Sequence, residues 1–442
     1  MPADRSTSGA RGLLIAAPAS GAGKTTLTLA LLRALKTAGR SVVSAKSGPD
    51  YIDPRFHEAA SGAPCINLDA WAMSPSTLAA LYVRLAGAHD LLVVEGAMGL
   101  FDGAANGRGS AADLAAALAL PVVLLVDCAR QSQSVAALVH GFRSFRKDVT
   151  VAGVILNRVG SVRHEAMLRD ALKPLAVEVL GALPRSDDLQ LPERHLGLVQ
   201  AGEHPDLEAF LDKAAGLCRE RIDLDRLEAM AAPAAPGETR IAELPAPLGQ
   251  RIAVAHDTAF AFAYPHLFDH WRAEGADLSF FSPLADEAPA SCADAVYLPG
   301  GYPELHAGRL ARASAFRSAM RQAAGAGKLI YGECGGYMTL GSGLVDADGT
   351  RHEMLGLLPL ETSFAHRRRC LGYRRIRPLG GLPWRGTLSA HEFHYATTRS
   401  EGAAERLFSA EDASGNRLAD MGLRSGTVMG SFAHVIASRP EA

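Results

Sequence analysis

Residues 13–26 read LLIAAPASGAGKTT, an apolar run followed by a glycine-rich turn and a Gly-Lys-Thr-Thr sequence at the start of a helix-forming stretch. Glycines in such a turn let backbone N–H groups close on phosphate oxygens, while the lysine adds positive charge and a hydroxyl can bind Mg²⁺. Pro18 stands where a P-loop usually has its first glycine, but strand, loop and helix follow in the required order. We predict a site for ATP or another nucleoside triphosphate. Its expected residues are Gly21, Gly23, Lys24, Thr25 and Thr26.

Short apolar runs alternate with helix-forming stretches on both sides of residues 231–250, which are rich in proline and alanine. Before this segment, strands are expected at residues 12–17, 41–45, 90–94, 121–127, 151–157 and 177–182. Helices are expected there at residues 24–38, 111–120 and 131–145. After the segment, strands are expected at residues 251–256, 276–281, 295–298 and 329–331. This alternation is typical of mostly parallel, doubly wound sheets.

The chain of 442 residues exceeds the size at which single cores stop growing, about 250 to 300 residues. We therefore predict two doubly wound α/β domains, residues 1–230 and 251–442, with residues 231–250 as a semi-rigid linker. The first should bind ATP and the substrate.

Composition excludes several classes of function. The formal charge is −2 without a basic block, which gives no support to a nucleic-acid or membrane partner. Six scattered cysteines without a C-x-x-C pair argue against a disulfide framework or a zinc site. Residues 1–11 are polar, and no apolar run reaches the ~18 residues that a membrane span needs. We expect a cytoplasmic protein.

Polar side chains stand where the strands of the first half end. Glu95 closes an apolar run, so a parallel strand would bring its carboxylate to the ligand crevice, where it can hold Mg²⁺. Asp50, Asp53 and Asp102 lie in nearby turns, and aspartates beside proline and glycine are also common turn formers. Asn157 ends another strand; it could read the nucleotide base, and a capping role fits equally well.

A second reactive feature is Cys334, in residues 328–337, which read KLIYGECGGY. A short strand stops at the cysteine and two glycines follow at once, which is the form of a nucleophile elbow. A thiol at the following helix N-terminus gains thiolate character. The alternative is a buried structural cysteine.

A thiol nucleophile needs a base and N–H donors for its tetrahedral intermediate. The turn LPGGYPE offers the Gly301 N–H, and the Gly335 N–H would be the second oxyanion donor. His434, in GSFAHVI, is the candidate base, although any one of 15 histidines is more often a packed core residue.

Several motifs resemble a known family. LPGGYPEL, YGECGGYM and SFAHV resemble class I glutamine amidotransferase domains of the cobyric-acid type. APASGAGKTT, SGPDYIDPRFH, VEGAMGLFDG and VILNRV resemble the cobyrinic and hydrogenobyrinic acid a,c-diamide synthases, as do HEFHY and the region 361–374. The resemblance covers nearly the whole chain in order. It implies an N-terminal P-loop NTPase-like, dethiobiotin-synthetase-like domain and a C-terminal flavodoxin-like amidotransferase domain.

The resemblance implies a ligase that converts the a- and c-acetate groups of a corrin ring into amides with ATP, Mg²⁺ and glutamine. The first domain would make an acyl phosphate, with Thr25, Asp50 and Glu95 as metal ligands. Asp53 and Asp102 would position the substrate or assist the attack of ammonia.

In the second domain Cys334 would attack glutamine while His434 relays protons. Class I glutaminases usually carry a glutamate two residues after the histidine, but Ile436 stands there, which suggests a Cys-His dyad. An orienting acid from elsewhere stays open. An enclosed path for ammonia is expected between the domains.

Other interpretations remain at this point. Cobyric acid synthase amidates other side chains of the same ring. A partitioning-type P-loop ATPase would usually carry a second lysine where Ala19 stands, and a glutaminase-like module without activity would need no reactive Cys334. Arg367, Arg368 and Arg369, with His391 and His394, could bind ring carboxylates, although a triple arginine is more often a solvated loop. Cobalt in the ring, the order of amidation and a homodimeric state do not follow from residue types.

Overall fold

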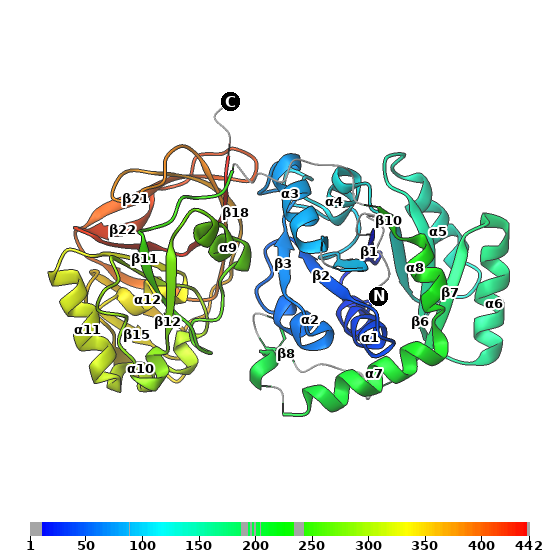
Figure 1. Ribbon diagram of the computed structural model, residues 1–442, viewed down its shortest axis with the longest axis horizontal. Helices are drawn as coiled ribbons and strands as arrows, with labels where there is room; N and C mark the ends of the chain where they lie inside the picture. Colours follow the sequence, from blue (N-terminus) through cyan, green and yellow to red (C-terminus); the bar gives the residue numbers. More distant parts are fainter. Residues whose placement is uncertain are drawn as a thin grey trace, which may run out of the picture. The chain divides into compact units, whose positions relative to one another are not determined.

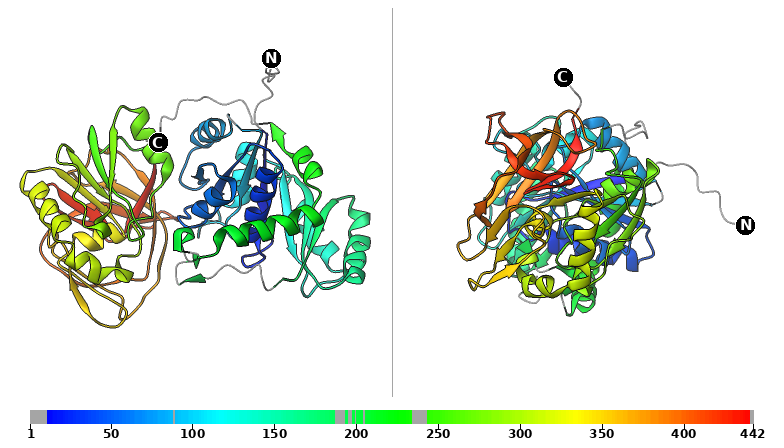
Figure 2. Two further views of the ribbon diagram at one scale, coloured as in Figure 1. Left: turned by 60° about the horizontal axis from the view of Figure 1, so that its bottom comes forward. Right: turned by 90° about the vertical axis from the view of Figure 1, so that its left-hand side faces the viewer.

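The computed structural model describes residues 11–439 except residues 88, 187–192, 195–196, 199, 204 and 234–242. The polar start of the chain and the middle of the expected linker therefore lie outside the described residues. The chain divides into two compact units, residues 1–242 and 243–442 (Figures 1 and 2).

Unit 1 is built on an eight-stranded sheet of order β3-β2-β4-β1-β5-β6-β7, with β10 pairing with the start of β1. All pairings are parallel except that of β10. The strands are β1 Arg11–Ala16, β2 Val42–Ser47, β3 Cys65–Leu68, β4 Leu91–Glu95, β5 Val122–Asp127, β6 Val151–Val159, β7 Glu178–Pro184 and β10 Ala232–Pro233. A separate pair joins β8 Glu193–Arg194 and β9 Gly197–Leu198.

The central strands of unit 1 are nearly continuous apolar runs, as expected for parallel strands covered on both faces. The residues of β4 are all buried, and so are Leu13, Leu14 and Ile15 of β1. Helix α1 lies beside α7 (Figure 1). The helices are α1 Lys24–Thr37, α2 Asp53–Ser61, α3 Pro75–Ala86, α4 Ala111–Leu118, α5 Val135–Ser144, α6 Val162–Leu172, α7 Leu207–Arg221 and α8 Leu224–Met230.

Unit 2 contains a ten-stranded sheet of order β12-β11-β13-β14-β23-β22-β21-β18-β19-β24. The first five strands in this order, from β12 to β23, pair in parallel. The pairings from β23 to β24 are all antiparallel. A four-stranded sheet, β16-β15-β17-β20, completes the unit. The larger sheet comprises β11 Arg251–Ala255, β12 Asp277–Phe281, β13 Ala295–Leu298, β14 Leu329–Glu333, β18 Cys370–Pro378, β19 Leu388–His394, β21 Glu405–Asp412, β22 Met421–Ser425, β23 Val428–Ser431 and β24 Ala433–Ser438.

Both faces of the central parallel strands β11, β13 and β14 are buried. Successive side chains of β11 point to opposite faces, so Ile252 and Val254 join one apolar cluster while Ala253 and Ala255 join the other. The helices are α9 Pro265–Ala273, α10 Ala307–Arg312, α11 Ser314–Gly325 and α12 Gly335–Leu340. The smaller sheet has β15 Gly343–Val345, β16 Arg351–Glu353, β17 Leu360–Ser363 and β20 Thr397–Glu401.

The structure confirms the predicted fold class, two α/β units with a parallel sheet in the first, and adds elements that the sequence analysis did not anticipate. These are β3, the antiparallel half of the large sheet and the small sheet. The helix expected at residues 131–145 begins only at Val135. The described ends of the expected linker are packed, because Ala232–Pro233 forms β10 and the Nε1 atom of Trp271 donates to the carbonyl of Pro245.

Among the described residues, no helix is both long enough and apolar enough to cross a membrane.

Candidate active sites

The phosphate loop of unit 1 lies between β1 and α1. Gly21 and Gly23 have φ angles of 77° and 95°, a left-handed conformation that favours glycine. Gly23 caps the N-terminus of α1, and the N–H groups of a first helical turn have no carbonyl partner within the helix, so they can bind an anion. The Nζ atom of Lys24 donates to the carbonyl of Met98, and burial lowers the pKa of Lys24. This is the local geometry of a P-loop.

Two carboxylates converge on the hydroxyl of Thr25. Its Oγ1 atom donates to Oε1 of Glu95 at 2.7 Å and lies 3.2 Å from Oδ2 of Asp53. Hydroxyl and carboxylate oxygens are the donors that Mg²⁺ prefers. These side chains would suit the metal that accompanies a bound nucleoside triphosphate.

Asp50 has a different environment. Its Oδ1 atom accepts from the backbone N–H groups of Ile52 at 2.8 Å and Asp53 at 3.0 Å. Asp50 thus stabilises the turn that leads into α2. This is the turn-forming role that the sequence offered as the alternative to metal binding. The structure places Asp53, rather than Asp50, in contact with Thr25.

Lys46 completes this site and was missed by the sequence analysis. Its Nζ atom lies 2.6 Å from Oδ2 of Asp53 and 2.7 Å from Oε1 of Glu95. The Nε2 atom of His57 lies 2.7 Å from the other oxygen of Glu95. The available signal was a lysine inside the strand VVSAKS, whose other residues are valine, alanine and serine. An unpaired buried ammonium is costly, so a lysine in a buried strand indicates a nearby carboxylate.

The pKa values follow from these contacts. Burial alone would lower the pKa of Lys46, but Asp53 and Glu95 outweigh it and raise the pKa above its ordinary range. Burial would raise the pKa of Glu95, yet Lys46 and His57 hold it below its ordinary range. Burial and the neighbouring Asp50 raise the pKa of Asp53 to about 6. Burial opposes protonation of His57, but contacts with Cys65 and Glu95 raise its pKa to about 10.

Two further predicted residues of unit 1, Asp102 and Asn157, lie beside the phosphate loop. Asp102 is exposed, and its Oδ2 atom accepts from the N–H of Gly99 at 2.9 Å. Its charge is one of those that oppose the lowering of the Lys24 pKa. The Nδ2 atom of Asn157 donates to the carbonyl of Ala22 at 2.8 Å, so this side chain holds the phosphate loop against β6.

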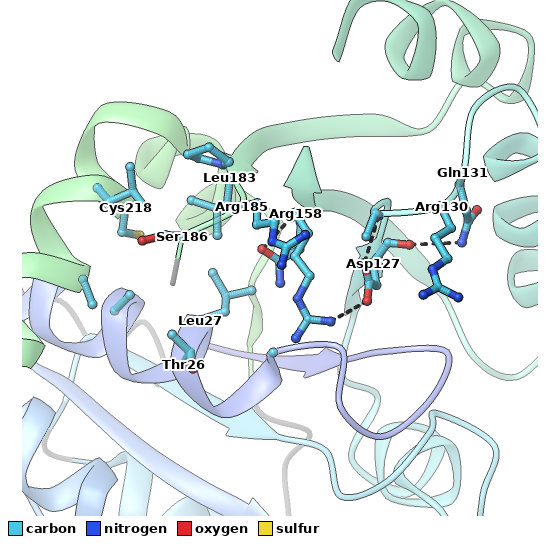
Figure 3. A pocket seen from close by; sticks show the side chains of 17 residues that line it. Thr26, Leu27, Asp127, Arg130, Gln131, Arg158, Leu183, Arg185, Ser186 and Cys218 are labelled. Carbon is cyan, nitrogen blue, oxygen red and sulfur yellow. Dashed lines mark hydrogen bonds and ion pairs between the residues drawn. The ribbon is translucent and has the colours of Figure 1, made fainter. Parts of the chain in front are cut away.

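A cavity of about 720 Å³ opens beside the phosphate loop (Figure 3). Gly23 and Asn157 line its end nearest the loop, and Leu27 adds an apolar wall. In Figure 3 the guanidinium of Arg158 points toward Asp127, and the two form an ion pair of 2.5 Å. The position of the cavity next to α1 suits the nucleoside part of a bound nucleotide.

In unit 2 the strand β14, Cys334 and the helix α12 form a sharp turn. Cys334 has φ 46° and ψ −104°, an unusual backbone conformation for a residue other than glycine. A side chain on Gly336 would place its Cβ atom 2.0 Å from the carbonyl oxygen of Leu298, so this position of the turn requires glycine. The strand–turn–helix geometry is that of a nucleophile elbow.

His434 and Cys334 converge on Gly300. A Cβ atom added to Gly300 would lie 2.9 Å from Nε2 of His434 and 3.2 Å from Cβ of Cys334. A Cβ atom added to Gly335 would lie 2.9 Å from the backbone nitrogen of Gly301, so the two predicted oxyanion donors are neighbours. The structure therefore brings together all four residues predicted for this site.

Both reacting groups are buried and favour their neutral forms. Burial raises the pKa of the Cys334 thiol above its ordinary range, with Glu304 adding to the effect and the Gly335 N–H opposing it. Burial lowers the pKa of His434 to about 3, with smaller effects from His391 and His394. A neutral imidazole beside a neutral thiol can accept its proton as the thiol attacks.

The motif HEFHY lies on β19, the strand beside β24. His391 pairs across the sheet with His434 and is buried, which lowers its pKa to about 4. The ring of His394 stacks on Phe432 with centroids 4.1 Å apart. Residues 367–369, the triple arginine, are exposed, as in the solvated-loop interpretation.

Together the two sites define a protein class, in which a P-loop nucleotide-binding unit precedes a glutamine amidotransferase unit. Residues 13–199 match the CobQ/CobB/MinD/ParA nucleotide binding domain, and residues 251–442 match the CobB/CobQ-like glutamine amidotransferase domain.

Relatives identify the family. Hydrogenobyrinate a,c-diamide synthase of Brucella abortus is 62% identical over 436 residues, 98% of this chain and 100% of the relative. The enzyme of the same name from Rhizobium meliloti is 61% identical over 425 residues, 96% of this chain and 99% of the relative. The chain belongs to the hydrogenobyrinate a,c-diamide synthase family. A solved structure of a glutamine amidotransferase is 18% identical, and the match covers 41% of this chain and 89% of that chain with a TM-score of 0.30.

Proposed function

We propose that this chain converts the a- and c-acetate carboxylates of hydrogenobyrinic acid into amides, a glutamine-dependent step of cobalamin biosynthesis that consumes ATP. The observation that carries the proposal is the presence, in one chain, of a phosphate loop with converging carboxylates and a cysteine elbow facing a histidine. Neither site alone makes an amide from a carboxylate and glutamine.

Unit 1 activates the carboxylate. A ring carboxylate oxygen attacks the γ-phosphorus of ATP, the bond to the ADP oxygen breaks, and an acyl phosphate forms. Thr25, Glu95 and Asp53 would hold Mg²⁺, which would supply charge neutralisation for the phosphates. Lys24 binds phosphate oxygens from the first turn of α1. Asp102 positions the substrate from beside the phosphate loop.

Asp50, first predicted as a metal ligand, is assigned an indirect role in this scheme. It holds the turn that presents Asp53, through the N–H bonds to Ile52 and Asp53. The cavity beside α1 would take the nucleoside, with Asn157 fixing the loop in front of it.

Unit 2 supplies ammonia. The Sγ atom of Cys334 attacks the side-chain amide carbon of glutamine while His434 accepts the thiol proton. The N–H groups of Gly301 and Gly335 stabilise the oxyanion, and His434 returns the proton to the departing ammonia. Water then hydrolyses the thioester and releases glutamate. Ammonia attacks the acyl carbon in unit 1, phosphate leaves, and one proton is lost to form the amide.

The decisive experiment separates the two nitrogen sources. The Cys334→Ser variant, given hydrogenobyrinic acid and ATP, should form no diamide with glutamine but should form it with ammonium chloride at high pH. Mass spectrometry of the product shows whether two carboxylates have been converted into amides. Loss of synthesis with both nitrogen sources would contradict the two-site scheme.

Tandem mass spectrometry of the same product tests the rival substrate position. Amides on side chains other than the a- and c-acetates would favour a cobyric-acid-synthase activity. A partitioning-type ATPase would show no amide at all. We also propose a cytoplasmic enzyme and a homodimer. Light scattering of the purified protein measures the oligomeric state.

A further inference from the structure

Glu333 directly precedes the nucleophile and is the last residue of β14. Its side chain is 2% exposed, and that of His434 is 1% exposed. The Oε2 atom of Glu333 lies 3.7 Å from the Nδ1 atom of His434. An acid therefore faces the far side of the proposed catalytic base, although Ile436 occupies the position where class I glutaminases usually carry one.

The other contacts of Glu333 fix where its carboxylate sits. The hydroxyl of Tyr297 donates to Oε2 at 2.7 Å, and the hydroxyl of Tyr331 donates to Oε1 at 3.1 Å. The backbone N–H of Val435, one residue after His434, also donates to Oε1 at 3.1 Å. These donors come from β13, β14 and β24, so the carboxylate is tied both to the elbow strand and to the strand that carries the histidine.

The two nitrogens of His434 point in different directions. Nε2 lies toward Gly300 and Cys334, since a Cβ atom on Gly300 would lie 2.9 Å from Nε2 and 3.2 Å from Cβ of Cys334. Nδ1 lies toward Glu333. An imidazole that accepts a proton on Nε2 must carry its own proton on Nδ1, and a carboxylate beside Nδ1 favours that tautomer.

We propose that Glu333 is the positioning acid of the glutaminase site, holding the Nδ1–H tautomer of His434 so that Nε2 accepts the Cys334 proton. The inference rests on the proposed function of the elbow. The separation of 3.7 Å is longer than a formed hydrogen bond but within ion-pair range. Catalytic hydrogen bonds commonly shorten when substrate binds. The carboxylate stabilises the imidazolium that forms when the thiol attacks.

A purely structural role is the alternative, because Glu333 also joins three strands through its hydrogen bonds. Glu333→Gln separates the two roles. Its amide oxygen can accept from the Tyr331 hydroxyl and its NH2 group can donate to the Tyr297 hydroxyl, but it has no charge for the imidazolium. A structural role predicts lower stability with normal turnover of the folded enzyme, whereas a positioning role predicts folded enzyme with low turnover.

The test measures glutaminase kcat and the KM for glutamine in the full chain. For Glu333→Gln we expect kcat to fall by about 10²- to 10⁴-fold with KM for glutamine within about threefold, since proton transfer is impaired and binding is not. Ammonia-dependent diamide synthesis should be unchanged. The matched control is Glu361→Gln on β17, which removes a carboxylate that pairs with Arg351 and should leave kcat within about twofold.

Wild-type kcat in folded Glu333→Gln would overturn the proposal. If the proposed glutaminase site itself were wrong, His434→Asn would retain glutaminase activity, so this outcome can be told apart from an error about Glu333. If Glu333→Gln does not fold, ¹⁵N-histidine NMR of the wild-type protein still tests the proposal, and His434→Asn assigns the His434 signals. We expect the Nδ1–H tautomer at His434, and a dominant Nε2–H tautomer would contradict the proposal.

Discussion

The Nζ atom of Lys46 lies 2.7 Å from Oε1 of Glu95, and both side chains are buried. The same carboxylate oxygen accepts from the hydroxyl of Thr25 at 2.7 Å. The acid that we propose as a metal ligand therefore already has a fixed cation beside it. Without that ammonium, Glu95 and Asp53 would be two buried carboxylates in mutual repulsion, which raises the cost of keeping both ionised.

Replacing Lys46 by methionine should destabilise unit 1 and abolish diamide synthesis. Methionine fills similar space but leaves Glu95 and Asp53 without their shared partner, and breaking a buried ion pair costs about 3–5 kcal/mol. Urea unfolding measures the loss, and ammonia-dependent synthesis measures the activity. Lys36→Met, an exposed lysine of α1, is the control and should change neither. Equal unfolding midpoints for the two variants would contradict the assigned role of Lys46.

Gly300→Ala should abolish glutaminase activity while ammonia-dependent synthesis remains. The added methyl group would lie 2.3 Å from Cε1 of His434, a separation that forces the imidazole to move. Displacements of about 1 Å can cost about 10²-fold in rate.

The control for that substitution is Gly325→Ala at the end of α11. A Cβ atom there meets nothing within 4 Å, so activity should be unchanged. Full glutaminase activity in Gly300→Ala would show that His434 is not held where the structure places it.

Asn157→Ala should weaken ATP binding about fivefold. The substitution leaves the carbonyl of Ala22 without the amide that now donates to it at 2.8 Å, and a lost hydrogen bond of this kind costs about 1 kcal/mol. The KM for ATP with ammonia as nitrogen source measures the effect, while glutaminase activity should not change. Asn416→Ala, in an exposed turn of unit 2, is the control. An unchanged KM would contradict the loop-holding role.

The sequence predicted those parts of the sites that are local in the chain. The phosphate loop and the cysteine elbow each depend on a few consecutive residues, since a tight turn between strand and helix needs glycine at set positions. Lys46 escaped prediction because its meaning depends on the parallel register that sets it opposite Glu95. That register joins strands 49 residues apart.

The same reason explains the missed acid. Glu333 was read only as part of a strand before Cys334, and its neighbour His434 is about 100 residues further along the chain. The antiparallel half of the sheet, which returns β24 to the end of β14, was not anticipated. Its strands include half-exposed polar runs such as residues 370–378 of β18. The parallel pairing of β14 with β23 sets Glu333 beside Ser431, and without it nothing in the residue pattern places the Val435 N–H on the Glu333 carboxylate.

The pH dependence of stability should differ between the wild type and Glu333→Gln. Burial raises the pKa of Glu333 to about 7 from an ordinary 4.5, against the opposing hydrogen bonds from Tyr297, Tyr331 and the Val435 N–H. Because the folded-state pKa is raised, the folded protein binds the proton more tightly than the unfolded chain does. The stability contributed by this group is fully present below pH 4.5 and is lost as the pH rises through 7.

Glutamine cannot ionise, so Glu333→Gln should gain stability relative to the wild type between pH 5 and pH 8, by up to about 3 kcal/mol. Urea unfolding followed by tryptophan fluorescence measures the difference, since Trp384 packs on Tyr331 at 5.1 Å between ring centroids. Glutaminase kcat of the wild type should rise with pH through about 7 as the carboxylate forms, and that limb should vanish in Glu333→Gln. A variant that is more stable at pH 8 and yet inactive would mean that the enzyme keeps a destabilising buried charge because His434 needs it. A stability difference that stays constant from pH 5 to pH 8 would contradict a shifted pKa at Glu333.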